Sequence, residues 1–166
     1  EQSIGHSASL EGEPGRYLVA ESGYLVAEIR AIKKQADNTF YLVNAGFTDL
    51  VRPSFYGSYH GISIIACDDR ELNESENVIV AGPLCESGDV FTQEEGGFVV
   101  TRNLPKAQVG DLLILHDAGA YGASMSSNYN SRRYAAEAMY SKGELKLIRE
   151  RQSFEQMLQN DKVIDF

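Results

Sequence analysis

The chain has 166 residues, 43% of them hydrophobic and 23% charged, which is ordinary for one globular domain with a core of its own. Its formal net charge is −9 and its basic residues are scattered singly or in pairs, so nucleic acid and anionic membranes are poor partners for it. No apolar run approaches the roughly 18 residues that cross a bilayer, and no basic, apolar leader opens the chain, so we predict a soluble protein of the cytoplasm.

The first part of the chain predicts a helix followed by a hairpin. Residues 1–10 carry neither an initiator Met nor a targeting pattern, and we expect the chain to be a piece of a longer protein. Residues 17–27 have apolar anchors interrupted by a glycine, which favours a short helix that runs into a strand. Residues 28–34 alternate charged and apolar side chains, Asn38 supplies a turn, and residues 40–43 are aromatic and β-branched, so we expect a hairpin.

Short strands dominate the rest of the prediction. Turns rich in Gly, Asp and Asn separate the candidates, which lie at residues 62–66, 78–81, 98–101, 112–115, 138–141 and 144–149. Lys142-Gly143 joins the last two as a tight turn, and the run at 112–115 is expected to be buried on both faces. Ser153 begins a short carboxy-terminal helix. We therefore predict a mainly β protein, a Greek-key-like barrel or sandwich.

Arg52 and Tyr56 form the first candidate binding pair, in the sequence Arg52-Pro53-Ser54-Phe55-Tyr56. Pro53 suits a first helical turn, and a helix places residues four apart on one face. A guanidinium beside a phenol can hold a carboxylate through several hydrogen bonds. The alternative is an arginine paired with one of the many acids of this chain.

The two cysteines differ in context, and they offer no disulfide framework or zinc spacing. Cys67 lies in a strand-like run, where a buried small hydrophobe is expected. Cys85 lies in a Gly/Pro-bounded turn after an apolar strand, where side chains are presented outward. An ordinary thiol is mostly protonated at neutral pH and suits a proton donor. Glu86 beside it can bind an ammonium group, although the turn alone favours a structural role.

Two glycine-containing segments are candidates for holding an anion and a planar ring. In Glu13-Pro14-Gly15-Arg16, the glycine permits close approach of the backbone to a phosphate and Arg16 adds charge. In residues 117–123, small residues and two glycines surround Tyr121, which leaves a smooth surface for a ring. A β-bulge explains the same glycines equally well.

Other polar groups carry less information. Residues 128–132 are either a polar loop or the wall of a site, and both interpretations stay open. His6, His60 and His116 occur singly, without ligand spacing between them, so we expect no metal site.

The order and spacing of these segments resemble one family over most of the chain. From Glu13 to Arg132 the sequence resembles the carboxy-terminal part of the diaminopimelate decarboxylases, which belong with the ornithine and arginine decarboxylases. The resemblance implies an amino-terminal (β/α)8 barrel that carries pyridoxal phosphate, of which residues 1–26 are a remnant with the last strand and helix, followed by a β-domain at residues 27–166. One departure is Arg133, where the family usually has proline.

The resemblance also implies site roles. Glu13, Pro14, Gly15 and Arg16 line the cofactor phosphate, Arg16 reaches the substrate, and Tyr121 touches both. Arg52 and Tyr56 hold the distal end of meso-diaminopimelate. The full-length enzyme converts this substrate to L-lysine and CO2.

Cys85 is implied as the proton donor and Glu86 as an ammonium ligand, both entering the partner subunit's barrel, so that a homodimer builds each site. The triplet Cys85-Glu86-Ser87 favours diaminopimelate over ornithine, since ornithine-type enzymes carry Asp after the cysteine. No lysine of this chain lies in the family's Schiff-base motif, so the piece alone should be inactive and should not bind pyridoxal phosphate.

Three alternatives remain at this point. The chain is a catalytically silent homologue that binds or regulates another decarboxylase, a decarboxylase for another basic amino acid, or an unrelated all-β module for a small ligand. The retained Cys85, Arg52, Tyr56 and Tyr121 argue against the silent homologue, because a binding-only protein has no need of them.

Overall fold

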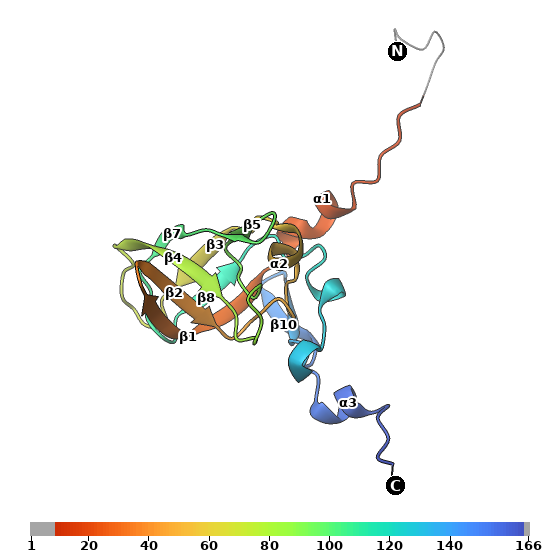
Figure 1. The fold of residues 1–166 in the computed structure, drawn as a ribbon. Helices are drawn as coiled ribbons and strands as arrows, with labels where there is room; N and C mark the ends of the chain where they lie inside the picture. The colour runs from red at the N-terminus through yellow and green to blue at the C-terminus, as the bar shows by residue number, and fades with distance from the viewer. Residues whose placement is uncertain (1–8, 165–166) are drawn as a thin grey trace.

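A computed structural model describes residues 9–164 of the chain (Figure 1). Most of its strands are short and its helices span a few residues each, as the frequent turn signals predict, but β1 has 11 residues. In chain order the elements are α1 Gly15–Val19, η1 Ala20–Ser22, β1 Leu25–Gln35, β2 Asn38–Val43, α2 Arg52–Tyr56, β3 Ile62–Ile65, β4 Ser75–Ala81, β5 Gln93–Glu94, β6 Phe98–Val99, β7 Arg102–Pro105, β8 Leu112–Leu115, η2 Ala123–Met125, η3 Tyr129–Ser131, β9 Glu137–Ser141, β10 Glu144–Arg149 and α3 Phe154–Leu158.

Six strands form one curled sheet in the order β3-β8-β1-β2-β4-β7. The first part of β1 pairs with β8, and the rest pairs with β2 after a register shift between Ile29 and Ala31. A bulge of this kind bends a strand, so β1 can serve both halves of the sheet. The pair β2·β4 is parallel, whereas the other neighbouring pairs are antiparallel.

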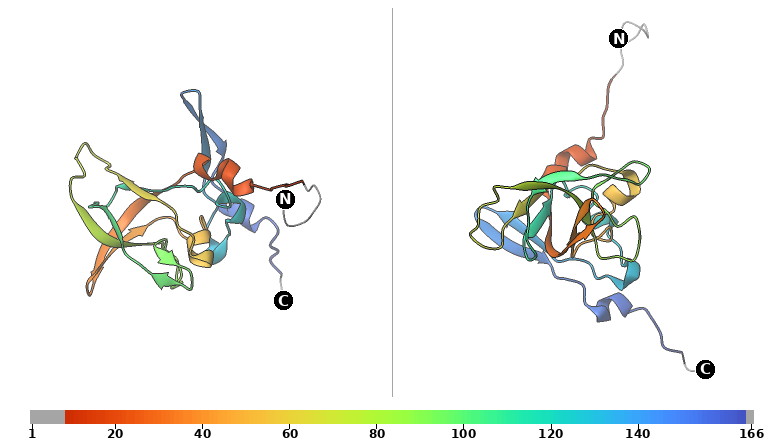
Figure 2. Two further views of the ribbon diagram at one scale, coloured as in Figure 1. Left: turned by 90° about the horizontal axis from the view of Figure 1, so that it is seen from above. Right: turned by 60° about the vertical axis from the view of Figure 1, so that its left-hand side comes forward.

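The sheet curls until its edge strands β3 and β7 contact each other (Figure 2, right). Arg102 of β7 secures this approach. Its Nη1 donates to the carbonyl oxygen of His60 at 3.0 Å, and its guanidinium lies 3.9 Å from the ring centroid of Tyr59. Apolar side chains fill the interior, among them Ile29, Tyr41, Val78, Val80, Leu113 and Leu115. The near-closure therefore fixes residues 59 and 60 just before β3.

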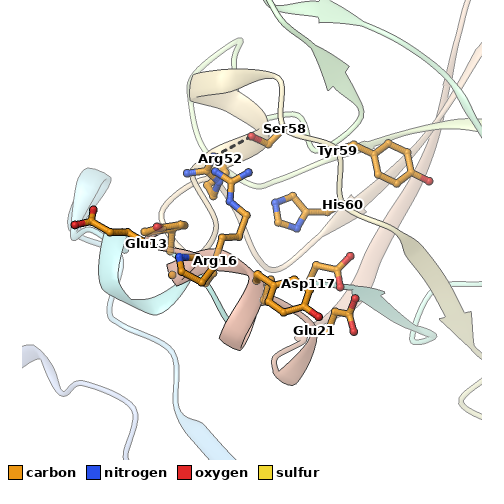
Figure 3. Close-up of a pocket in the computed structure, with 14 residues that line it drawn as sticks. Glu13, Arg16, Glu21, Arg52, Ser58, Tyr59, His60 and Asp117 are labelled. Atoms are coloured by element: carbon orange, nitrogen blue, oxygen red, sulfur yellow. Dashed lines mark hydrogen bonds between the residues drawn. The ribbon is translucent and has the colours of Figure 1, made fainter. Parts of the chain in front are cut away.

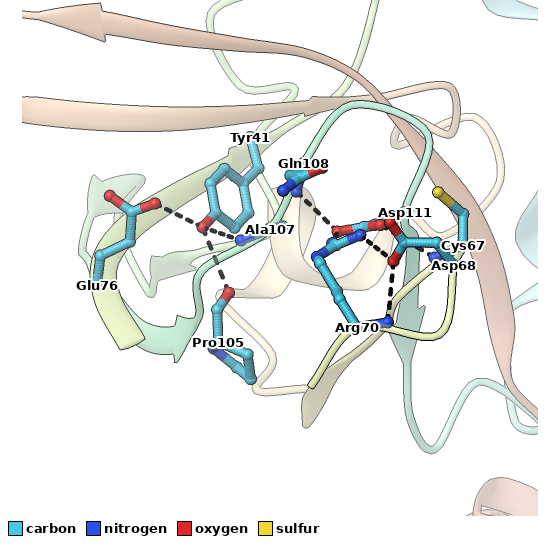
Figure 4. A network of polar contacts seen from close by, with 9 residues as sticks. All are labelled: Tyr41, Cys67, Asp68, Arg70, Glu76, Pro105, Ala107, Gln108 and Asp111. Carbon is cyan, nitrogen blue, oxygen red and sulfur yellow. Dashed lines mark hydrogen bonds and ion pairs between the residues drawn. The ribbon is translucent and has the colours of Figure 1, made fainter. Parts of the chain in front are cut away.

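Asp111 organises the loops at one end of the barrel (Figure 4). Its fully buried carboxylate accepts hydrogen bonds from the backbone N–H of Gln108 at 2.7 Å and of Cys67 at 3.1 Å, and from the Arg70 guanidinium. Burial alone would raise the pKa of Asp111, but these donors together lower it below its usual value.

Tyr41 crosses the core to a second polar group at the same end. Its hydroxyl donates to Glu76 Oε1 at 2.8 Å and accepts from the backbone N–H of Ala107 at 3.0 Å (Figure 4). Burial raises the pKa of Tyr41 to about 12. The hydroxyl thus stays protonated and ties β2 to the start of β4 and to the loop after β7.

The carboxy-terminal part projects from the barrel. Strands β9 and β10 form a separate two-stranded ribbon that stands away from the six-stranded sheet (Figure 2, left). The tight turn at Lys142 and Gly143 has left-handed backbone at both residues. Helix α3 begins at a capping box, in which Ser153 and Gln156 bond to each other's backbone N–H.

The predicted fold class is confirmed, with two corrections in detail. The run at 112–115 is not buried on both faces: Leu113 and Leu115 are fully buried, whereas Leu112 is 37% exposed, because one face of β8 turns away from the core. Cys67 is exposed, because β3 ends at Ile65 and the cysteine lies in the following loop.

The expected barrel remnant is visible only in part. Residues 9–14 form no regular element, and α1 follows them, while residues 1–8 of the remnant lie outside the described residues. The boundary between residues 26 and 27 stays a prediction. In the described part of the chain, no helix has the length and apolar character needed to span a membrane.

Candidate active site

A cleft of about 720 Å³ opens beside α1 (Figure 3). Residues 58–60 precede β3 and Asp117 follows β8, so the cleft lies at the end of these two strands opposite to Asp111. Its walls come from residues 13–17, from residues 58–60 between α2 and β3, and from the loop that follows β8. This volume is in the range of small-molecule sites. The cleft therefore has room for an amino acid or a part of a cofactor.

Two glycines bring α1 and the loop after β8 into direct backbone contact. A Cβ at Gly119 would lie 2.0 Å from the carbonyl oxygen of Val19, and one at Gly23 would lie 2.5 Å from Gly119 Cα. Because glycine has no Cβ atom, the two segments can approach each other, and the Gly119 N–H donates to the Ala20 carbonyl at 3.0 Å. Glycine is required at both positions, and this close approach places Arg16 beside Tyr121.

Tyr121 is held in an unusual backbone conformation. Its φ is 62°, in the left-handed region that bulky residues rarely adopt. A Cβ at the next residue, Gly122, would lie 2.4 Å from the Ala118 carbonyl oxygen, so the tight loop depends on that glycine. Such strain persists where the surrounding structure enforces it, often at functional sites. The loop turns the Tyr121 ring toward the two arginines of the cleft.

Arg16 and Arg52 flank Tyr121 without a carboxylate partner. Their guanidinium carbons lie 5.7 and 5.1 Å from the Tyr121 ring centroid. Within residues 9–164 neither arginine forms an ion pair, and the hydrogen bond from Arg52 Nη2 to Ser58 Oγ is long, at 3.4 Å. In a chain of net charge −9, two unpaired guanidiniums in one cleft indicate an anionic ligand.

Helix α2 presents Arg52 and Tyr56 on one face, as their spacing predicts. The Arg52 guanidinium lies 4.8 Å from the Tyr56 ring centroid. Gly57 ends the helix in the left-handed conformation with φ 60°, and a Cβ there would lie 2.0 Å from the Glu95 backbone nitrogen. Tyr56 is half exposed and stands next to the cleft without lining it.

His60 also lines the cleft, and no role was predicted for it from the sequence. Its side chain is 5% exposed, and its Nδ1 lies 2.8 Å from the carbonyl oxygen of His116. Burial lowers the pKa of His60, and the nearby Arg52 and Arg16 lower it further. One sequence signal could have indicated that His60 lies near a site. It comes just before the apolar run at 62–65, and residues at the end of a strand lie at the rim of a barrel.

The turn that carries Cys85 and Glu86 is built around Asp89. This buried carboxylate accepts from the N–H of Leu84 at 2.8 Å and of Phe47 at 2.7 Å. Burial raises the pKa of Asp89, against the effect of these two N–H groups. Cys85 and Glu86 are exposed on the turn, outside the cleft.

The structure thus brings together part of the predicted site. Residues 13–16, Arg52 and Tyr121 line one cleft, whereas Cys85 and Glu86 do not. The segment at 128–132 does not line it either: Arg132 Nη2 donates to the Asn44 carbonyl oxygen at 2.6 Å, and Asn128 bonds to Arg132 and Gln152. Arg133, the departure from the family pattern, lies over the Phe154 ring of α3 at 4.7 Å.

The cleft fits the anionic end of pyridoxal phosphate. Arg16 offers a guanidinium, and Tyr121 offers a phenol ring beside it. No lysine is among the described residues that line the cleft, so an amine for imine formation is not supplied there. Residues 9–164 hold no cluster of three or more His, Cys, Asp or Glu side chains suited to a metal ion; His6 lies outside the described residues.

The fold is a curled sheet domain, and two guanidiniums without an ion-pair partner in residues 9–164 face a cleft at one end of it. The family profile described as "Pyridoxal-dependent decarboxylase, C-terminal sheet domain" matches residues 16–119. This match covers more than half of the chain, and the chain belongs to this family of pyridoxal-dependent decarboxylases.

Its similarity to diaminopimelate decarboxylases is high over most of its length. It is 57% identical to that of Escherichia coli (strain K12) over 157 residues, or 93% of this chain and 37% of that protein. A crystal structure of a diaminopimelate decarboxylase matches with a TM-score of 0.85 and 56% identity, covering 87% of this chain and 35% of that one. The M. jannaschii enzyme solved with L-lysine matches with a TM-score of 0.78 and 41% identity, covering 90% and 32%. The chain therefore spans 32 to 37% of the length of these relatives.

Proposed function

We propose that this chain is the carboxy-terminal part of a cytoplasmic pyridoxal-phosphate-dependent decarboxylase, which converts meso-diaminopimelate to L-lysine and CO2. The observation that carries the proposal is the pair of unpaired guanidiniums, Arg16 and Arg52, that face one cleft beside Tyr121. The names of its relatives supply the substrate, and the two free cysteines suit a reducing compartment.

In this proposal the cleft binds and orients the substrate. Arg52 holds the distal carboxylate through paired N–H donors, with the Tyr56 hydroxyl beside it. Arg16 serves both the substrate and the cofactor phosphate near residues 13–15, and the Tyr121 ring lies against both. Pyridoxal phosphate, when bound, supplies the electron sink that takes up the electron pair left by departing CO2.

Cys85 completes the reaction by proton transfer. Its Sγ gives a proton to the carbon from which CO2 has left and regains one from solvent, while Glu86 accepts hydrogen bonds from a substrate ammonium. Both residues are exposed on a turn outside the cleft of their own chain. A homodimer in which the turn enters the partner's site resolves this separation, and the 166-residue chain alone is then inactive.

Replacing Cys85 tests the proton-donor role. In the full-length enzyme that contains this chain, we expect Cys85→Ala to reduce kcat for CO2 release from meso-diaminopimelate by about 10²- to 10⁴-fold. Cys67→Ala is the matched control, since Cys67 is equally a free, exposed thiol but lies at the other end of the barrel. An unchanged rate for Cys85→Ala would remove this residue from the mechanism.

Subunit mixing tests the shared site separately. Subunits carrying Cys85→Ala are mixed with subunits carrying Arg52→Ala, each inactive as a homodimer. If Cys85 serves the partner's cleft, each mixed dimer has one intact site of two, and since half the dimers are mixed, about a quarter of the wild-type activity returns. No recovery in dimers shown to have exchanged would place both residues in one subunit's site.

A further inference from the structure

His60 has a hydrogen-bonding capacity that the proposed function does not use. His60 is only 5% exposed, and it lies in the segment between α2 and β3. Its ring faces the cleft between Arg52 and Asp117 (Figure 3). Within residues 9–164 its Nδ1 has a partner, the His116 carbonyl, but no hydrogen bond to its Nε2 is formed.

The backbone contact determines the tautomer of this imidazole. A carbonyl oxygen only accepts, so the 2.8 Å contact requires the proton to lie on Nδ1. In the neutral ring, Nε2 then carries a lone pair and no hydrogen. The carbonyl of His60 itself is held by Arg102 at 3.0 Å, so the ring is anchored at both its backbone and its Nδ1.

Burial, helped by two nearby arginines, lowers the pKa of His60 and keeps the ring neutral. Arg52 and Arg16 face it from α2 and α1, and both oppose a third positive charge in the cleft. The hydrogen bond to the His116 carbonyl and the charge of Asp117 favour the charged form, but burial and the arginines outweigh them, so the pKa of His60 is lowered. The cleft therefore presents two guanidinium donors and, beside them, the neutral acceptor His60 Nε2, in addition to the carboxylates of Glu13, Glu21 and Asp117.

We propose that His60 Nε2 accepts a hydrogen bond from the distal ammonium group of the substrate, at the same end as the carboxylate that Arg52 holds. A ligand that binds both the guanidiniums and His60 Nε2 carries a carboxylate and an ammonium group on the same carbon atom, as an α-amino acid does. An ammonium has three N–H donors, so it can bind His60 and Glu86 together. This inference rests on the proposed function, and it makes His60 a residue that selects an amino acid end over a plain carboxylate end.

The test compares two substrates in the full-length enzyme: meso-diaminopimelate and 2-aminopimelate, which has the same chain length but lacks the distal ammonium. His60→Asn keeps a donor near the Nδ1 position for the His116 carbonyl and removes the Nε2 acceptor. We expect the ratio of kcat/KM values, diaminopimelate over 2-aminopimelate, to fall by about 10- to 100-fold, the weight of one hydrogen bond to a charged group.

Two further variants make the result specific. His60→Gln places an amide oxygen near the Nε2 position, and we expect it to keep the ratio within about threefold of the wild-type value. His116→Asn is the matched control, because its Nε2 bonds to Ser63 Oγ at 2.8 Å and its side chain does not line the cleft. It should leave the ratio unchanged.

The outcomes separate this inference from the function on which it rests. A wild-type enzyme that releases no CO2 from diaminopimelate contradicts the proposed function. A wild type that does so, with an unchanged ratio in His60→Asn, overturns the role of His60 alone. If His60→Asn does not fold, His60→Gln decides alone. A fall of about 10-fold or more in its ratio of kcat/KM values, although its amide oxygen replaces the acceptor, also overturns the role of His60.

Discussion

Polar side chains at the two ends of strands β3 and β8 differ in how many hydrogen-bond partners they have. At one end, the carboxylate of Asp111 and the hydroxyl of Tyr41 are saturated by partners from their own chain. At the other end, the guanidiniums of Arg16 and Arg52 and the Nε2 of His60 face a cleft without comparable partners in the described residues.

This difference separates what the chain needs in order to fold from what it needs in order to act. Buried polar groups that are fully paired stabilise one arrangement of loops, and removing a single partner costs the full desolvation of the others. Unpaired donors at a cleft contribute little to folding, but they are ready for a ligand. Substitutions at the two ends should therefore affect different measurements.

The largest effect is expected at the cleft. Arg52→Ala in the full-length enzyme removes two charge-assisted hydrogen bonds to a substrate carboxylate, about 4 kcal/mol together, so kcat/KM for meso-diaminopimelate should fall by about 10³-fold. Arg52→Lys keeps the charge but loses the paired N–H geometry, so kcat/KM should fall by less in this variant. The stability of both variants should stay close to that of the wild type, because Arg52 forms no ion pair with any residue from 9 to 164.

A control at an exposed arginine sharpens this result. Arg30 pairs with Glu28 on the surface of β1, and its side chain is 63% exposed. Arg30→Ala should change neither kcat/KM nor stability measurably. A loss smaller than tenfold in Arg52→Ala would contradict carboxylate binding by this residue.

The next effect is expected at the paired end, and in stability instead of rate. Asp111→Asn places an amide N–H₂ among three donors, and unfolding of the chain in urea at pH 7 should show a loss of about 2 to 4 kcal/mol. Because the pKa of Asp111 is lowered in the fold, its contribution is present above pH 3.8, the ordinary value, and is lost as pH falls through the lower folded value.

The pH dependence isolates the charge of Asp111 from its packing. Wild-type stability should therefore drop more steeply than that of Asp111→Asn below pH 3.8. Asp68 offers the control, since its carboxylate, 55% exposed, binds the same Arg70, and Asp68→Asn should have a much smaller effect. Parallel acid curves for the wild type and Asp111→Asn would show that this carboxylate does not carry the effect.

Local sequence signals predicted the elements that carry the site. A proline at the second position of residues 52–56 predicted helix α2, and four-residue spacing placed Arg52 and Tyr56 together. Gly and Pro around Cys85 predicted its exposed turn. These features depend on backbone preferences within a few residues, which is why they can be predicted from the sequence.

Features set by distant contacts could not be predicted in this way. Cys67 was expected to be buried, but its segment is held by Asp111, 44 positions away, and leaves the sheet. His60 depends on the carbonyl of His116, 56 positions away, and on the loop that brings Arg16 near it. The strands β5 and β7 were also missed, because they are short and lack an apolar pattern.

The smallest effect is expected at Asp89, which combines properties of both ends. It is buried and bonded to Leu84 and Phe47, yet it supports the turn that carries Cys85. In Asp89→Asn, the amide N–H₂ must face one of these two N–H donors, but the cost of a buried charge disappears. We expect a loss of only about 1 to 2 kcal/mol at pH 7, with faster hydrogen exchange at the Leu84 or Phe47 amide.

The sign of its pH dependence distinguishes Asp89 from Asp111. Its pKa is raised by burial, so the stability it contributes is fully present below pH 3.8 and is lost as pH rises through the folded value. Asp89→Asn should remove this component, opposite in direction to that of Asp111→Asn. If exchange at both amides and the rate of the full-length enzyme are unchanged, Asp89 does not position the turn, and the exposed conformation of Cys85 must depend on the Gly and Pro residues alone.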